Sequence, residues 1–202
     1  MTDSATPMQR RRELLACGVA LALPARAAPG VALEQALRGA QAAGGVLMFR
    51  HALAPGTFDP PGFRLDDCAT QRNLDDEGRR QARRLGAWFA ARQFRPARVC
   101  SSPWCRCLET ARLAFGDRVE PWPALGSPRA GHEKANAPAL AQLREGLSTV
   151  VRRGAGFEVW VTHMFVFSAL LGEGAGSGEG VLLGPGEEGA PRVIMRIAGL
   201  VA

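Results

Sequence analysis

The stretch Val46–Gly56, which reads VLMFRHALAPG, decides the fold of this 202-residue chain. Its first four residues are an apolar run of the kind that fills a buried strand, and the run stops abruptly at Arg50 and His51. In an open α/β sheet, ligands bind beyond the carboxyl ends of the strands. The strand end at Arg50 and His51 therefore predicts a functional site.

Two other apolar runs end in the same way. Pro96–Cys100 is followed by two serines and then by Arg106, and Phe157–Thr162 is followed by His163. If the three strand ends meet, they bring two imidazoles and two guanidinium groups together. Arginine pairs bidentately with phosphate oxygens, and a helix that opens at Ser102 would add free backbone N–H groups. We therefore predict a phosphate pocket at this edge of the sheet.

Strand-like and helix-like segments alternate through the rest of the chain. The expected helices are Ala32–Ala43, one that begins at Leu74 with an Asp near its N-cap, one that begins at Ser101-Ser102-Pro103, Pro138–Arg153 and Met164–Leu171. The expected strands are Val46–Phe49, Pro96–Cys100, Arg118–Trp122, Phe157–Thr162, and the two strands of a hairpin, Gly180–Leu183 and Val193–Ile197. This alternation predicts an α/β fold, a three-layer α/β/α sandwich with a largely parallel central sheet. Residues 28–202 are expected to form this single domain, and its long loop Ala52–Asn73 is expected to be functional or mobile.

The first 27 residues have the layout of an export signal. Three arginines at 10–12 precede an apolar stretch at 14–23 and the small-residue pattern Ala-Arg-Ala at 25–27. The apolar stretch is too short to span a bilayer as a stable helix, so we expect cleavage near Ala27 and no stable membrane anchor. The arginine pair resembles a twin-arginine signal, which predicts a periplasmic protein. The alternatives are a misassigned start codon or a surface helix.

The charge pattern favours an anionic substrate over a nucleic acid. The net charge is +6, but the arginines are scattered, and no run of Lys or Arg lies outside the first segment. A mildly basic domain of this kind suits a small anionic ligand. The sequence does not indicate the oligomeric state.

Four of the five cysteines lie outside the predicted signal, and an oxidising compartment would favour a disulfide among them. Cys100 ends a predicted buried strand and is expected in the core, which leaves Cys68 to pair with Cys105 or Cys107. A zinc site is not expected, because only one residue separates Cys105 from Cys107 and the chain has three histidines. No metal or other cofactor is predicted.

Four motifs resemble the histidine phosphatase superfamily, branch 1, the phosphoglycerate-mutase-like branch. The segment RHALAPGT resembles its R-H-G signature, with Ala52 in place of the usual Gly. LDDEGRRQARRLG, from Leu74, resembles the L-T-x-x-G-x-x-Q-A helix, and SSPWCRCLETA, from Ser101, resembles S-S-P-x-x-R-x-x-x-T-A. VTHM matches the strand end that carries the second histidine. The motifs follow the family order from about Val46 to Met164, and the R-H-A variant resembles exported members similar to the lipopolysaccharide core heptose-phosphate phosphatase.

The resemblance implies a phosphoglycerate-mutase-like fold and a role for each matching residue. His51 would be the nucleophile that accepts the phosphoryl group, and Arg50, Arg106 and His163 would form the rest of the phosphate pocket. Thr57 falls where many members have an Asn that also touches the phosphate. Because His51 must be neutral to attack, its ring is expected to be held by a backbone carbonyl.

The proton donor is the point where the chain departs from the family pattern. Family members often carry an acidic residue in a stretch that begins near Leu125, where this chain has Gly126-Ser127-Pro128. Glu133 is the candidate catalytic acid, with His132 as the weaker one, and the alternative for Glu133 is an exposed loop residue.

Four further residues have competing interpretations. Arg64 and Arg72, in the long loop, either contact substrate or are surface charges. Trp88 and Trp104 are expected to be packing residues.

Together these observations predict a metal-independent phosphomonoesterase that acts through phospho-His51 on a small phosphorylated substrate, for instance a cell-envelope saccharide phosphate. Arginines and histidines provide the charge neutralisation that phosphoryl transfer needs. The alternatives are a non-catalytic anion-binding protein of the same fold and a protein phosphohistidine phosphatase. A mutase is disfavoured by the predicted export.

Overall fold

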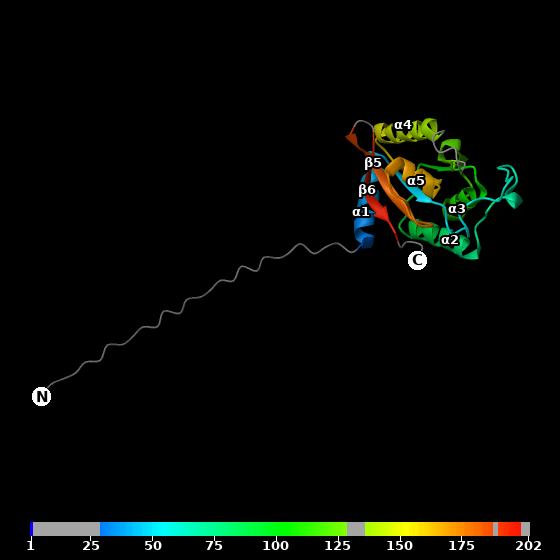
Figure 1. Cartoon of the computed structure of the whole chain (residues 1–202). Coiled ribbons are helices and arrows are strands. Elements are labelled where there is room, and N and C mark those ends of the chain that lie inside the picture. The colour runs from blue at the N-terminus through cyan, green and yellow to red at the C-terminus, as the bar shows by residue number, and fades with distance from the viewer. Residues whose placement is uncertain (2–28, 129–135, 188–189, 199–202) are drawn as a thin grey trace.

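Helices and strands alternate along the chain in the computed structural model (Figure 1). The structure describes residues 1, 29–128, 136–187 and 190–198. The helices are α1 (Pro29–Ala43), α2 (Asp76–Ala91), α3 (Cys105–Phe115), α4 (Ala137–Arg153) and α5 (Met164–Leu171), with short 3-10 turns at Cys68–Thr70 and Pro123–Leu125. The strands are β1 (Gly45–Arg50), β2 (Arg98–Ser101), β3 (Glu120–Pro121), β4 (Phe157–Thr162), β5 (Gly180–Pro185) and β6 (Pro191–Ile197).

The strands form one mixed sheet in the order β3-β2-β4-β1-β5-β6. The pairs β1–β4, β2–β4 and β2–β3 are parallel, whereas β1–β5 and β5–β6 are antiparallel. Of the four parallel strands, β1, β2 and β4 carry the predicted site at their carboxyl ends, and the predicted hairpin closes one edge. The prediction of a largely parallel α/β sheet is confirmed.

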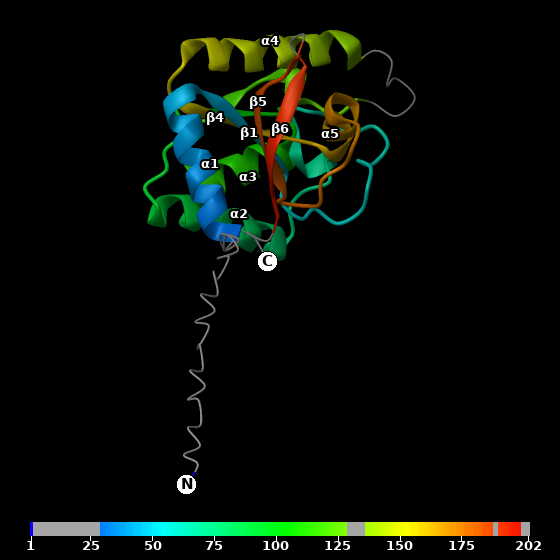
Figure 2. The same cartoon turned by 90° about the vertical axis from the view of Figure 1, so that its left-hand side faces the viewer.

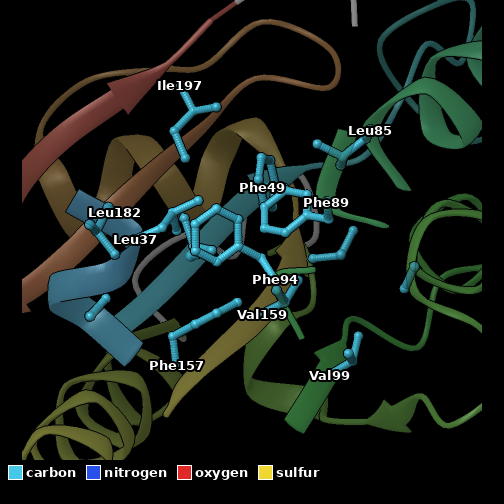
Figure 3. Close-up of a cluster of buried hydrophobic side chains, with 14 of the residues drawn as sticks. Leu37, Phe49, Leu85, Phe89, Phe94, Val99, Phe157, Val159, Leu182 and Ile197 are labelled. Carbon is cyan, nitrogen blue, oxygen red and sulfur yellow. The ribbon is translucent and has the colours of Figure 1, made fainter. Parts of the chain in front are cut away.

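Alternate residues of β1 face opposite layers of helices, as a pleated strand buried on both sides requires. Leu47 and Phe49 pack with residues of α1, α2 and α3, and Figure 3 shows Phe49 beside Phe89 of α2. Val46 and Met48 pack instead with residues of α4 and α5. Figure 2 shows α4 and α2 on opposite sides of the sheet. The fold is therefore the predicted three-layer α/β/α sandwich.

The start of α3 differs from the expectation that Ser101-Ser102-Pro103 opens the helix. Strand β2 continues through Ser101, and α3 begins at Cys105 with Trp104 as an N-cap whose side chain makes no capping hydrogen bond. The hydroxyl of Ser102 is instead paired with His163, with an Oγ–Nε2 distance of 2.7 Å. The Ser102 side chain, which was expected to cap the helix, therefore forms a contact within the site.

A disulfide between Cys68 and Cys105 joins the long loop to the first residue of α3. Cys107 is a buried free thiol. Of the two predicted partners of Cys68, it is therefore Cys105 that forms the disulfide. Cys100 lies in the core as predicted. The loop between β1 and α2 is thus held against the helix that carries Arg106.

Two sequence predictions fall outside the described residues, namely the export signal at 1–27 and the loop that contains His132 and Glu133. Among the helices of the described ranges, none combines the length and the apolar character needed to cross a membrane.

Candidate active site

The register of the parallel strands brings the three predicted strand ends together. Arg50 lies opposite Thr162 in the β1–β4 ladder, and the N–H of His51 donates to the Thr162 carbonyl at 2.9 Å. On the other side of β4, the N–H of Ser102 donates to the Val161 carbonyl at 2.9 Å. The rings of His51 and His163 consequently lie with their centroids 5.5 Å apart.

The chain that follows His51 is fixed by residues of the two helical motifs. Ala52 N–H donates to Thr110 Oγ1 at 3.1 Å, and Leu53 N–H donates to Gln81 Oε1 at 2.9 Å. Gly78 lets α2 approach this segment closely, since a Cβ at that position would lie 2.0 Å from the Leu53 carbonyl oxygen. The motif residues Gly, Gln and Thr therefore act by holding the backbone beside His51.

His51 is held as a neutral imidazole with one nitrogen free. Its Nδ1 lies 2.7 Å from the Ala52 carbonyl oxygen, which can only accept, so the ring proton is on Nδ1 and Nε2 keeps its lone pair. Burial, followed by the positive charges of Arg106, Arg50 and Arg72, lowers the pKa of His51 to about 3. The expected backbone partner for this ring is confirmed.

His163 is also neutral, but both of its nitrogens are engaged. Nδ1 accepts from Arg106 Nη2 at 3.3 Å, because a guanidinium can only donate, so Nε2 carries the proton that points to Ser102 Oγ. Burial, and then the charge of Arg106, lowers the pKa of His163 well below its usual value. His51 is thus the histidine with a nitrogen available for attack.

Three arginines line the cavity at this edge of the sheet: Arg50, Arg72 and Arg106. Burial, followed by the charge of Arg106, lowers the pKa of Arg72 to about 10. Within the described residues, four buried side-chain N or O atoms lack a hydrogen-bond partner, and three of them are the Nε atoms of these arginines. Buried donors without a partner are costly, so three of them around one cavity indicate a site for an anion.

Asp59 is the one carboxylate among the residues that line this cavity in the described chain. Its oxygens accept from Arg106 Nη1 at 2.8 Å and Nη2 at 3.2 Å, from Trp104 Nε1 at 3.1 Å, and from Arg72 N–H at 3.0 Å. Burial alone would raise the pKa of Asp59, but these hydrogen bonds, chiefly that from Arg106, lower it. Asp59 therefore fixes Arg106 by its two terminal nitrogens and leaves the Nε edge without a protein partner.

Most of the predicted site residues lie in this cavity. Arg50, His51, Thr57, Arg106 and His163 all line it. Glu133 and His132 lie outside the described residues, although Ser127 and Pro128, which precede their loop, also line the cavity.

The structure decides between the two interpretations of the loop arginines and gives Trp104 a role beyond packing. Arg72 faces the cavity, whereas Arg64 is exposed and pairs with Asp66, so only the first of the two loop arginines belongs to the site. Trp104 is more than a packing residue, because it both joins the core and donates to Asp59. Asp59 was not predicted; its nearness in sequence to the strand end at Arg50 and His51 was its available signal.

The cavity has a volume of about 430 Å³. Such a volume fits a small organic ligand. Its described charged groups are three guanidinium groups and one carboxylate, which leaves two positive charges unbalanced, as a phosphomonoester dianion requires. No group of three or more His, Cys, Asp or Glu that could hold a metal ion occurs in the ranges that the structure describes.

The two buried histidines make the stability depend on pH in a definite direction. An unfolded histidine has a pKa of about 6.5, whereas that of folded His51 is about 3, so between these values the unfolded chain binds more protons and stability falls as the pH falls. From pH 7 to pH 5, His51 should account for a loss of about 2 kcal/mol, at about 1.4 kcal/mol per unit. Urea unfolding at the two pH values should show His51→Gln losing about 2 kcal/mol less than the wild type; equal losses would contradict the neutral, buried ring.

The fold and the site define an α/β protein with a histidine and three arginines around one cavity, an arrangement that suits an anion. Comparison with sequence profiles gives the histidine phosphatase superfamily, branch 1, over residues 67–132. Comparison with curated protein sequences gives no match.

Several solved structures share the fold. The protein histidine phosphatase SixA complexed with tungstate is 19% identical, with 76% of this chain and 96% of that chain covered and a TM-score of 0.51. Phosphoglycerate mutase from Bacillus anthracis is 13% identical, with 77% and 93% covered and a TM-score of 0.59. A mycobacterial glucosyl-3-phosphoglycerate phosphatase in complex with VO3 is 18% identical, with 77% and 99% covered and a TM-score of 0.56.

The profile match over residues 67–132 supports the predicted histidine phosphatase superfamily, branch 1, and with it a phosphatase, and the solved structures share the fold. The finer resemblance to the heptose-phosphate phosphatase stays a prediction.

Proposed function

We propose that this protein is a phosphatase that hydrolyses small phosphomonoesters through a phosphohistidine formed on His51. The observation that carries the proposal is the free Nε2 of a neutral His51 beside three guanidinium groups whose buried Nε atoms have no partner. Such groups bind and neutralise a phosphoryl group, and the imidazole can attack it.

In the first step, the substrate phosphate pairs with Arg50, Arg72 and Arg106. His51 Nε2 attacks phosphorus in line with the ester oxygen; the P–N bond forms, the P–O bond to the alcohol breaks, and the leaving oxygen takes up a proton. The Ala52 carbonyl, which holds Nδ1–H, stabilises the positive charge that develops on the ring. The arginines stabilise the charge on the three phosphoryl oxygens.

In the second step, water attacks the phosphohistidine. The P–O bond to water forms as the water gives a proton back to the group that protonated the leaving oxygen, the P–N bond breaks, and the products are inorganic phosphate and neutral His51. The low pKa of His51 supports this step, because it returns a ring that is ready for the next attack without losing a proton.

Glu133 keeps its proposed role as the group that protonates the leaving oxygen. The support is its position in the sequence, shortly after Ser127 and Pro128, which line the cavity. Asp59 is a poor candidate for this role, because its hydrogen bonds hold it as a carboxylate.

Hydrolysis of p-nitrophenyl phosphate by the full chain in EDTA tests the proposal against the non-catalytic alternative. We expect release of nitrophenol that orthovanadate inhibits competitively. Phosphate binding measured by calorimetry, without any hydrolysis, would instead favour an anion-binding protein. A phosphohistidine-bearing protein offered as a competing substrate tests the remaining alternative, which the fold of SixA favours.

We also propose that the protein is exported to the periplasm after cleavage near Ala27. The disulfide between Cys68 and Cys105 supports an oxidising compartment. A C-terminally tagged chain found uncleaved in the cytoplasm would contradict this proposal. A saccharide phosphate of the cell envelope would be one substrate available there.

A further inference from the structure

The mouth of the anion cavity carries apolar rings. Phe58 is 66% exposed, and its ring stacks on that of Phe165 with centroids 6.1 Å apart and an interplanar angle of 13°. Phe63 and Met164 line the same cavity, and Phe63 packs at a tilt against Trp104. A phenylalanine this exposed leaves apolar area in water, and apolar patches at a cavity mouth mark places that a ligand covers.

The positions of these rings are tied to the groups that bind the phosphate. Phe58 immediately precedes Asp59, whose carboxylate is anchored by four hydrogen bonds. Phe165 lies in the first turn of α5, two residues after His163. The rings therefore flank the part of a substrate that extends from the phosphate ester oxygen.

The described part of the mouth has few side-chain groups that could satisfy the hydroxyls of a sugar. The guanidinium groups, the histidines and Asp59 are used at the base of the cavity, which leaves the hydroxyls of Thr57 and Ser127 among the described lining residues. A polar substrate that loses water without new hydrogen bonds binds weakly, whereas an apolar body gains free energy from the area that it buries.

We propose that the substrate is a phosphomonoester whose alcohol carries an apolar ring or hydrocarbon body, which packs against Phe58 and Phe165. This inference rests on the proposed phosphatase function. It names a substrate class different from the saccharide phosphate that the sequence suggested.

A matched pair of substrates tests the inference. Cyclohexylmethyl phosphate and glucose 6-phosphate both join a six-membered ring to phosphate through a CH₂–O group, so the reacting bonds are alike and only the ring polarity differs. We expect kcat/KM to favour cyclohexylmethyl phosphate by at least about 10-fold. Phe58→Ala should reduce this ratio at least about fivefold, whereas Leu65→Ala, which removes another exposed side chain of the same loop, should leave it unchanged.

A ratio of one or below, or a ratio that Phe58→Ala does not change, would overturn the substrate class and leave the phosphatase intact. Failure to hydrolyse p-nitrophenyl phosphate as well as both test substrates would overturn the proposed function itself. The two failures are therefore distinguishable in one set of assays.

Discussion

We expect His51→Ala to lower kcat/KM for p-nitrophenyl phosphate by at least about 1,000-fold, since removal of a nucleophile leaves only the binding and electrostatic contributions. Phosphate affinity should change little, because the charge that attracts the anion comes from Arg50, Arg72 and Arg106. The measurements are steady-state kinetics in EDTA and calorimetry with inorganic phosphate.

His51→Gln provides the second variant in case the alanine substitution disturbs the fold. It should be equally inactive and should still bind phosphate, because the amide fills the ring's place without a nucleophilic nitrogen. A variant that keeps a tenth or more of the wild-type rate would show that His51 is not the nucleophile.

We expect Asp59→Ala to lower the free energy of unfolding by about 3–5 kcal/mol, the usual effect of removing one partner of a buried ion pair. The side chains of Asp59 and Arg106 are 8% and 3% exposed, so the substitution leaves a buried guanidinium without its carboxylate. Added phosphate should restore part of the lost stability, because its oxygens would replace the carboxylate as the partner of Arg106.

Asp66→Ala is the matched control in the same loop. Asp66 also pairs with an arginine, but both partners are exposed, and such solvent-screened pairs contribute little to stability. Urea unfolding of the two variants, with and without phosphate, measures the difference. Equal losses for both variants would show that the Asp59–Arg106 contact does not stabilise the site.

The residues at strand ends were predictable because topology alone places them. Arg50, His51 and His163 follow buried runs, and parallel neighbours must present their carboxyl ends at one edge of the sheet. These strands are short and largely apolar, so the sequence indicated that they exist. Their observed limits differ from the predicted ones by at most two residues. The fold could therefore be read from periodicity and from the alternation of helix and strand.

The residues of the long loop were not predictable in the same way. Asp59 and Arg72 lie in a stretch without a repeating pattern, and their roles depend on contacts with α3 that are distant in sequence. The start of α3 was placed too early, because Ser102 has the chemistry of a cap and its actual partner, His163, lies 61 residues away. The sequence also left open which cysteine meets Cys68, since the choice depends on how the long loop lies against α3.

Rapid alkaline quenching during turnover of ³²P-labelled p-nitrophenyl phosphate, followed by mass spectrometry, tests the central claim most directly. A phosphohistidine survives alkali and is lost in acid, so its label can be located on the chain. We expect the phosphoryl group on His51 in the wild type and no label in His51→Ala. Single-turnover hydrolysis that leaves His51 unlabelled at every time point, or label on another residue, would contradict the phosphohistidine mechanism.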